Sequence, residues 1–243
     1  MKKFMCTILS VAMCAVLISG CGTSLEGEES VVYVDKKGTV LSLDAEELDQ
    51  DFYDETELKE FVDNAVQEYT DAYGKDTVKT EELTVENGIA KLKMKYKTPE
   101  DYTNFNGIEL YEGKVVASLA AGYVYDGNFA RVEDGKVVGA ATKQEIYAQE
   151  DLKVVIIRAN TNVKVDGQIC FVSCENVKLT GTDSVSIRDG YYLDTGADAV
   201  SENLTQGTEQ LDAVVENTET SVDEDVSGNG SFETDVYTFI VYK

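Results

Sequence analysis

The chain of 243 residues contains no histidine. This absence excludes Ser-His-Asp and Cys-His nucleophilic catalysis, imidazole proton shuttles near neutral pH, and zinc or haem bound through histidine. The enzyme chemistries that stay open are a carboxylate pair of the glycosidase kind, a Ser-Lys arrangement, and a metal held by carboxylates. No spacing among the 46 Asp and Glu residues singles out such a pair. The sequence therefore identifies no catalytic residue, and it disfavours an enzymatic function without excluding one.

Tryptophan is also absent, and positively charged residues are scarce. There are 21 Lys and Arg against 46 Asp and Glu, a formal net charge of −25. This balance argues against binding to nucleic acid, where cations meet phosphates, and against adsorption to anionic lipid headgroups. A divalent cation or a basic partner stays open. The 14 tyrosines offer rings for stacking on sugars, although the lack of tryptophan weakens a glycan-binding interpretation.

After the first 20 residues the chain has no long apolar run. The best stretch, Val115 to Tyr125, is broken by Ser118 and Gly122, whereas a helix that crosses a bilayer needs about 20 apolar residues. If the mature chain is held at a membrane, we therefore expect the attachment to be a lipid.

The N-terminal segment has the parts of a secretory leader. Lys2 and Lys3 form a positive start, Phe4 to Leu17 is almost entirely apolar, and Ile18-Ser19-Gly20-Cys21 follows. This segment resembles the signals of bacterial lipoproteins. The resemblance implies that residues 1–20 are removed, and that Cys21 carries a thioether-linked diacylglycerol and an often acylated N-terminus. The alternative is an ordinary secretory leader with a coincidental cysteine.

Residues 21–30 are predicted to be a flexible tether, with a root-mean-square reach of roughly 17 Å. Two or more acyl chains anchor a protein stably where one binds reversibly, so we expect a lipid-anchored protein on the extracytoplasmic face of the cell membrane. Loss of residues 1–20 leaves 223 residues and, because Lys2 and Lys3 go with them, changes the formal charge from −25 to −27. That length suits one large or two small domains.

The predicted fold class is α+β: an antiparallel sheet with one main amphipathic helix and short helices over residues 31–150, then a β-rich part over 151–243. The first part contains two hairpin signals, Asp35-Lys36-Lys37-Gly38 and Asn87-Gly88. Apolar residues at helical spacing between Asp54 and Gly74 predict the main helix, whose apolar face should pack on the sheet. That face comprises Leu58, Phe61, Val62, Ala65, Val66, Tyr69 and Tyr73.

Shorter features complete the first part. Thr98-Pro99 predicts the start of a short helix that ends at Asn106-Gly107, a further small helix or turn is expected over Val115 to Ala121, and Asp134-Gly135 marks another hairpin. Four lysines at alternate positions should line one strand face, either as a solvated surface that guards an edge or as an anion contact. They are Lys91, Lys93, Lys95 and Lys97.

The second part is predicted to begin at a soft boundary near residues 149–151. Two subdomains that share one core would give the same pattern. A stretch over about 197–231 is so rich in Thr, Ser, Glu, Asp and Gly that most of it is predicted to be a disordered acidic loop. The apolar run Val236 to Tyr242 must be buried, so we expect it to return as a strand of the body's sheet.

Two sets of residues in this part are candidates for special chemistry. Asp223, Asp225, Ser227 and Asn229 occupy positions of a calcium-loop pattern, but Thr234 replaces the bidentate glutamate, so they are weak metal candidates. Cys170 and Cys174 would lie roughly 13 Å apart on one strand, too far for a disulfide, which requires Cα atoms within about 7 Å. They pair only if the chain turns between them, and burial as small hydrophobes is the favoured interpretation.

Several short motifs together resemble a group of uncharacterised lipoproteins from Gram-positive bacteria. They are Tyr53-Asp54-Glu55, Asp101-Tyr102, Phe105-Asn106-Gly107 and Gly122-Tyr123. The group has no assigned activity, so the resemblance implies no functional residue beyond Cys21 and no cofactor. The predicted function is a non-enzymatic, lipid-anchored envelope protein that binds a protein or cell-wall partner. The alternatives are a carboxylate-based glycan-active enzyme and a weak calcium-binding surface protein; a transporter's solute receptor would need more helices.

Overall fold

The computed structural model describes residues 25, 27–48, 54–196 and 236–243. The leader, Cys21, the acidic loop expected over 197–231 and the calcium candidates Asp223, Asp225, Ser227 and Asn229 lie outside the described residues. Within these ranges the fold is α+β, with one mixed and one antiparallel sheet, one main helix and short helices. None of the described helices has the length and apolar character that crossing a bilayer requires.

Sheet A is mixed and has seven strands in the order β11-β12-β9-β1-β2-β4-β3. All its neighbours are antiparallel except β1 and β9, which run parallel. Its strands are β1 (Val31–Val34), β2 (Val40–Glu47), β3 (Val78–Glu86), β4 (Ile89–Tyr96), β9 (Asn162–Val165), β11 (Glu175–Leu179) and β12 (Ser184–Tyr192).

Sheet B is antiparallel throughout and has six strands in the order β5-β8-β13-β10-β6-β7. Its strands are β5 (Leu110–Lys114), β6 (Phe129–Glu133), β7 (Lys136–Ala141), β8 (Lys153–Ile157), β10 (Ile169–Ser173) and β13 (Thr238–Tyr242). The predicted return of the C-terminal run is confirmed, because β13 pairs with β8 on one side and β10 on the other.

The two longest helices begin and end where the sequence supplies a cap. The Asp54 side chain accepts hydrogen bonds from the backbone N–H groups of Thr56 and Glu57, and Gly74 ends the main helix. Thr98 caps the second helix, which Gly107 ends in a left-handed conformation. The helices are α1 (Glu55–Tyr73), α2 (Pro99–Asn106), α3 (Val115–Ala120) and α4 (Lys143–Tyr147).

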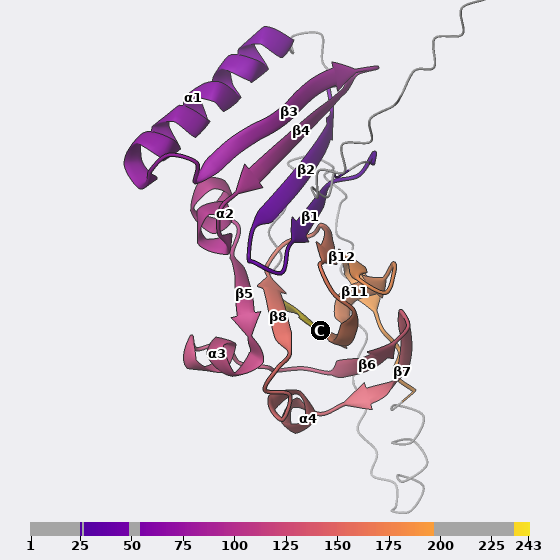
Figure 1. The fold of residues 1–243 in the computed structure, drawn as a ribbon. Helices are drawn as coiled ribbons and strands as arrows, with labels where there is room; N and C mark the ends of the chain where they lie inside the picture. Colours follow the sequence, from indigo (N-terminus) through magenta and orange to yellow (C-terminus); the bar gives the residue numbers. More distant parts are fainter. Residues whose placement is uncertain (1–24, 26, 49–53, 197–235) are drawn as a thin grey trace, which may run out of the picture.

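The main core lies between the two sheets. It combines side chains of sheet A, such as Val34 and Val163, with side chains of sheet B, such as Ile157 and Ile240, and α1 and α2 contribute Tyr69 and Tyr102 among others. The other face of sheet B forms a second core with residues of α3 and α4. In Figure 1, α1 lies along the outside of β3 and β4, and α3 and α4 lie at the opposite end of the molecule.

The helix α1 differs from its predicted packing in one respect. Val62 and Tyr69 are buried, but Phe61 and Tyr73 are 71% and 61% exposed. The helix contacts mainly β3, the edge strand of sheet A, so a single strand covers only part of the predicted apolar stripe. The prediction was wrong for Phe61 and Tyr73.

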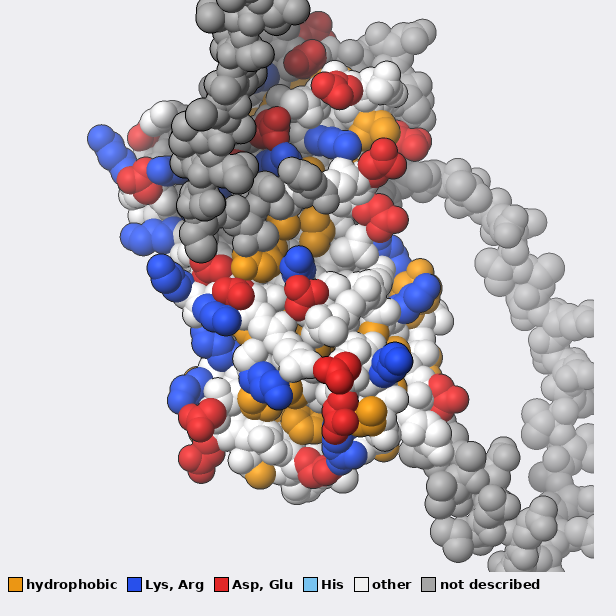
Figure 2. Space-filling model, turned by 45° about the vertical axis from the view of Figure 1, so that its right-hand side comes forward, with side chains coloured by type: hydrophobic (Ala, Val, Ile, Leu, Met, Phe, Trp, Pro, Cys, Tyr) orange, Lys and Arg blue, Asp and Glu red, His pale blue; other side chains and the backbone are white. Residues whose placement is uncertain are grey.

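Strand pairing crosses the boundary that the sequence suggested near residue 150. In sheet A, β1 pairs with β9, and in sheet B, β5 pairs with β8 and β6 pairs with β10. Each sheet therefore takes strands from both sides of that position. On the face drawn in Figure 2, positive and negative side chains are interspersed among small apolar patches, so the net acidity does not form one continuous patch there.

Candidate site formed by Glu109, Tyr123 and Tyr237

Three neighbouring strands of sheet B place a polar row at one end of the sheet. Leu110 and Thr238 both pair with Ile157, so the preceding or following residues Glu109, Arg158 and Tyr237 lie level with one another. The backbone N–H of Arg158 donates to the carbonyl oxygen of Glu109 at 3.1 Å. Because side chains alternate along a strand, this row continues the face that α3 covers.

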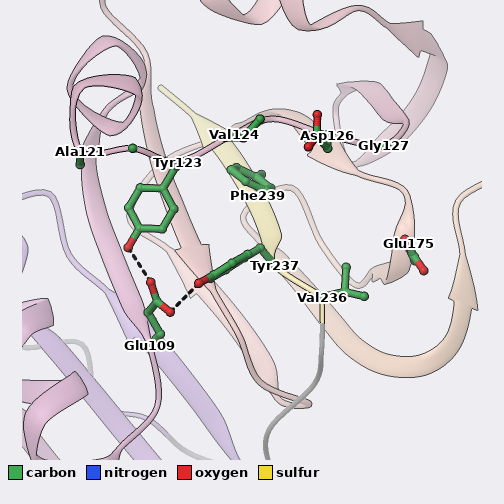
Figure 3. A pocket seen from close by; sticks show the side chains of 11 residues that line it. Glu109, Ala121, Tyr123, Val124, Asp126, Gly127, Glu175, Val236, Tyr237 and Phe239 are labelled. Carbon is green, nitrogen blue, oxygen red and sulfur yellow. Dashed lines mark hydrogen bonds between the residues drawn. The ribbon is translucent and has the colours of Figure 1, made fainter.

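The loop after α3 brings a second tyrosine to the row. Gly122 has φ 96°, a conformation that glycine adopts without strain, and it turns the chain sharply at the end of the helix. The backbone N–H of Tyr123 then donates to the carbonyl of Ser118 at 3.1 Å. The turn directs the Tyr123 ring back over the end of sheet B (Figure 3).

Both tyrosine hydroxyls donate to the same carboxylate. The Tyr123 hydroxyl lies 3.1 Å from Oε1 of Glu109, and the Tyr237 hydroxyl lies 2.6 Å from Oε2; Figure 3 shows the two hydroxyls pointing to the Glu109 carboxylate. Hydrogen bonds to a carboxylate are among the stronger ones in proteins. Glu109 is therefore held as a fixed acceptor between two rings that come from segments far apart in the sequence.

The same contacts keep the two hydroxyls protonated. Burial, followed by the hydrogen bond to Glu109 and its charge, raises the pKa of Tyr123. For Tyr237 the hydrogen bond to Glu109 is the largest cause of a raised pKa, which burial increases further and the charge of Arg158 opposes. Both groups are consequently donors at any physiological pH.

A cavity of about 600 Å³ opens beside these residues. The size lies within the range of small-molecule sites, roughly 300 to 1,000 Å³. Its described lining includes the exposed carboxylates of Asp126 and Glu175 as well as Glu109. Tyr123 and Tyr237 meet edge to face, with ring centroids 5.9 Å apart, and Tyr111 lies 5.0 Å from Tyr123. The cavity is thus aromatic and acidic at once.

A second cavity of about 680 Å³ adjoins the first, and Glu109 and Tyr123 line both. Glu112 also lines it, but its Oε1 accepts from Lys153 Nζ at 2.7 Å and from the Tyr242 hydroxyl at 3.3 Å. Lys153 Nζ in turn donates to the carbonyl of Lys36 at 2.8 Å. This cluster ties the β1–β2 hairpin to sheet B.

A smaller cavity of about 270 Å³ contains Asp44 and Tyr102. Burial raises the pKa of Asp44, a hydrogen bond from Ser42 at 2.9 Å opposes the shift, and the charge of Glu46 adds to it. Among the described residues, Asp44 is the carboxyl whose pKa is raised, and it lies in a different cavity from the tyrosine pair at Glu109. This arrangement does not match the glycosidase-like site that the sequence left open, in which the acid would lie beside exposed tyrosines.

The cysteines and lysines singled out from the sequence do not contribute to this site. Cys170 and Cys174 are both thiols; a β-bulge between Ile169 and Phe171 interrupts their strand, and they contact different cores. Burial raises the pKa of Cys170, which does not favour a thiolate nucleophile. The predicted lysine strand is β4, which is an inner strand of sheet A rather than an edge.

No group of three or more Cys, Asp or Glu side chains in the described ranges is arranged to hold a metal ion. The Glu109 site was not predictable from the sequence. Its residues come from 109, 123 and 237, and only the position of β13 beside β8 brings the last of them to the first. The presence of Tyr111, Tyr123 and Tyr125 within fifteen residues was the one local signal. No protein-family model, curated protein or solved structure matches the chain.

Proposed function

We propose that this protein is anchored by lipid at Cys21 on the extracytoplasmic face of the cell membrane and binds a protein or cell-wall partner through the cavity beside Glu109. The leader and Ile18-Ser19-Gly20-Cys21 support the location. The observation that carries the binding role is the Glu109 carboxylate, fixed by the Tyr123 and Tyr237 hydroxyls at 3.1 and 2.6 Å at the wall of a 600 Å³ cavity.

Binding suits this geometry better than catalysis. A general acid needs a carboxyl group that donates its proton, whereas both oxygens of Glu109 are held as hydrogen-bond acceptors by the two tyrosines. Rigid aromatic rings around a fixed acceptor are instead a pre-organised contact surface, which lowers the entropic cost of association.

Photo-crosslinking on intact cells tests this proposal. A photoreactive residue in place of Val124, which is 63% exposed and lines the cavity, should capture a neighbour. The matched control is Val138 on β7, which is 49% exposed and is not among the residues that line the cavity. Equal capture from both positions, or none from Val124, would refute the cavity as the binding surface.

A second candidate, a glycan-cleaving enzyme, rests on one observation: Glu109 and Glu112 line the same 680 Å³ cavity together with Tyr111 and Tyr123. Two carboxylates flanking a sugar are the usual machinery of such enzymes. Incubation of purified cell-wall glycan with the protein and with its Glu109→Gln and Glu112→Gln variants decides between the two functions. Release of soluble fragments that either variant abolishes would replace the binding proposal by the enzymatic one.

A further inference from the structure

The charges around the cavity beside Glu109 are unbalanced. Three carboxylates from separate segments line it, namely Glu109 before β5, Asp126 after α3 and Glu175 at the start of β11. None of the described residues that line it is Lys or Arg. Arg158, whose charge and hydrogen bond both lower the pKa of Tyr237, offsets part of this negative charge. A ligand that fits the cavity must therefore tolerate or neutralise an excess of negative charge.

The aromatic rings also favour a positively charged ligand. A cation is attracted to the face of a tyrosine ring when it lies within about 6 Å of the ring centroid. The ring centroids of Tyr123 and Tyr237 are 5.9 Å apart at an interplanar angle of 86°, and both hydroxyls donate to the same carboxylate. A compact cation beside them meets both the π surface of a ring and a negative charge.

The partners of Glu109 leave room for such a cation. An ionised carboxylate offers about four acceptor positions, and the two tyrosine hydroxyls account for one on each oxygen. The hydroxyls cannot be the source of a compensating positive charge, because tyrosine is neutral or negative. The remaining acceptor positions suit N–H donors, or the close approach of methyl groups on a quaternary nitrogen.

We propose that this cavity binds a small organic ammonium group, which packs against the rings of Tyr123 and Tyr237 on their cavity side and lies next to the carboxylate of Glu109. The inference rests on the proposed function, because it names the chemistry of the ligand for the same cavity. An alkylammonium group fits better than a metal ion. Its methyl or methylene groups bury against Phe239 and Val124, which also line the cavity, and it does not require several oxygen ligands at short range.

The test compares choline with dimethylbutanol, its neutral analogue, in which a tert-butyl group replaces the trimethylammonium group. Binding to the full chain in a polyoxyethylene detergent is followed by saturation-transfer NMR and by calorimetry. We expect millimolar or tighter binding of choline, at least about tenfold weaker binding of dimethylbutanol, and weakening of choline binding by Glu109→Gln of about tenfold.

Matched variants separate the site from general charge and from misfolding. Glu133→Gln removes the same charge from an exposed position on β6 and should leave choline binding unchanged. Asp126→Asn and Glu175→Gln alter exposed side chains, so they test the site even if Glu109→Gln destabilises the fold. Each should weaken choline binding by a smaller factor than Glu109→Gln.

The outcomes distinguish this inference from the function on which it rests. Equal binding of choline and dimethylbutanol, indifference to all three acidic variants, or no binding of choline overturns the ammonium assignment. Selective crosslinking at Val124 would still support the cavity as a binding surface in that case. Loss of crosslinking at Val124 would overturn the proposed function itself, whatever small molecules bind.

Discussion

Replacement of Ile240 by alanine should destabilise the fold severely, because this side chain lies at the centre of sheet B. Ile240 is fully buried, and it pairs with Val155 of β8 on one side and Val172 of β10 on the other. The substitution removes three carbon atoms, worth roughly 2.4 kcal/mol of transfer free energy at about 0.8 kcal/mol each. The cavity left behind adds to this loss, so we expect about 3 to 4 kcal/mol in total.

Urea unfolding of the full chain in a non-ionic detergent measures this cost. The chain has 14 tyrosines and no tryptophan, so tyrosine fluorescence and far-ultraviolet circular dichroism are suitable probes. The midpoint should fall while the slope stays constant, and the melting temperature should fall by about 10 °C. The control Val116→Ala, at a position 55% exposed on α3, should change stability by less than about 0.5 kcal/mol. A loss below about 1 kcal/mol for Ile240→Ala would refute the central position of β13.

Three further predictions concern the anchor, alkaline stability and a tight turn. Cys21→Ser should release the protein from membranes into the medium. Mass spectrometry of the native protein should find the leader absent and a lipid on Cys21, and an unmodified thiol there would contradict the anchor. Burial raises the pKa of Tyr96 to about 12, above the roughly 10 of an unfolded chain, so the folded state binds the proton more tightly. The contribution of Tyr96 to stability should then be constant below about pH 10 and fall by roughly 1.4 kcal/mol per pH unit up to about pH 12, in addition to the contributions of the other tyrosines whose pKa is raised. Tyr96→Phe should make the total decline shallower by this amount, and an unchanged slope would argue against the assignment. Gly167→Ala should lower the free energy of unfolding in urea by about 1 to 3 kcal/mol, because a Cβ there would meet the backbone oxygen of Lys243 and lie 2.7 Å from the Tyr242 ring. The control Gly27→Ala, whose Cβ meets nothing nearer than 3.9 Å, should be nearly neutral. Equal effects of the two substitutions would contradict the tight packing at Gly167.

Features that depend on local chemistry were predictable from the sequence. Asp54 and Thr98 begin helices as expected because their side chains accept hydrogen bonds from nearby backbone N–H groups. Asn87-Gly88 and Asp134-Gly135 both form hairpin turns, and the four residues have positive φ angles. In each case the signal and the structure it produces lie within a few residues of each other.

Features that depend on distant pairing were not predictable in the same way. The strand β5 and the helix α4 were missed, because the first is short and contains Glu112 and Gly113 and the second has only five residues. Nothing in the sequence of β1 indicates that it runs parallel to β9, about 130 residues later. The Glu109 site was missed for the same reason, since its partners are defined by sheet order and not by spacing.

The central place of β13 in sheet B also determines when this protein can fold. The strands β8 and β10 are not neighbours until β13 lies between them, so a nascent chain that still lacks residues 238–242 has a gap in the middle of the sheet. Such a chain must wait for late synthesis before its cores close, and contacts this distant in sequence form slowly. Under the extracytoplasmic location proposed above, this delayed closure would leave the chain extended while it is threaded through the export channel.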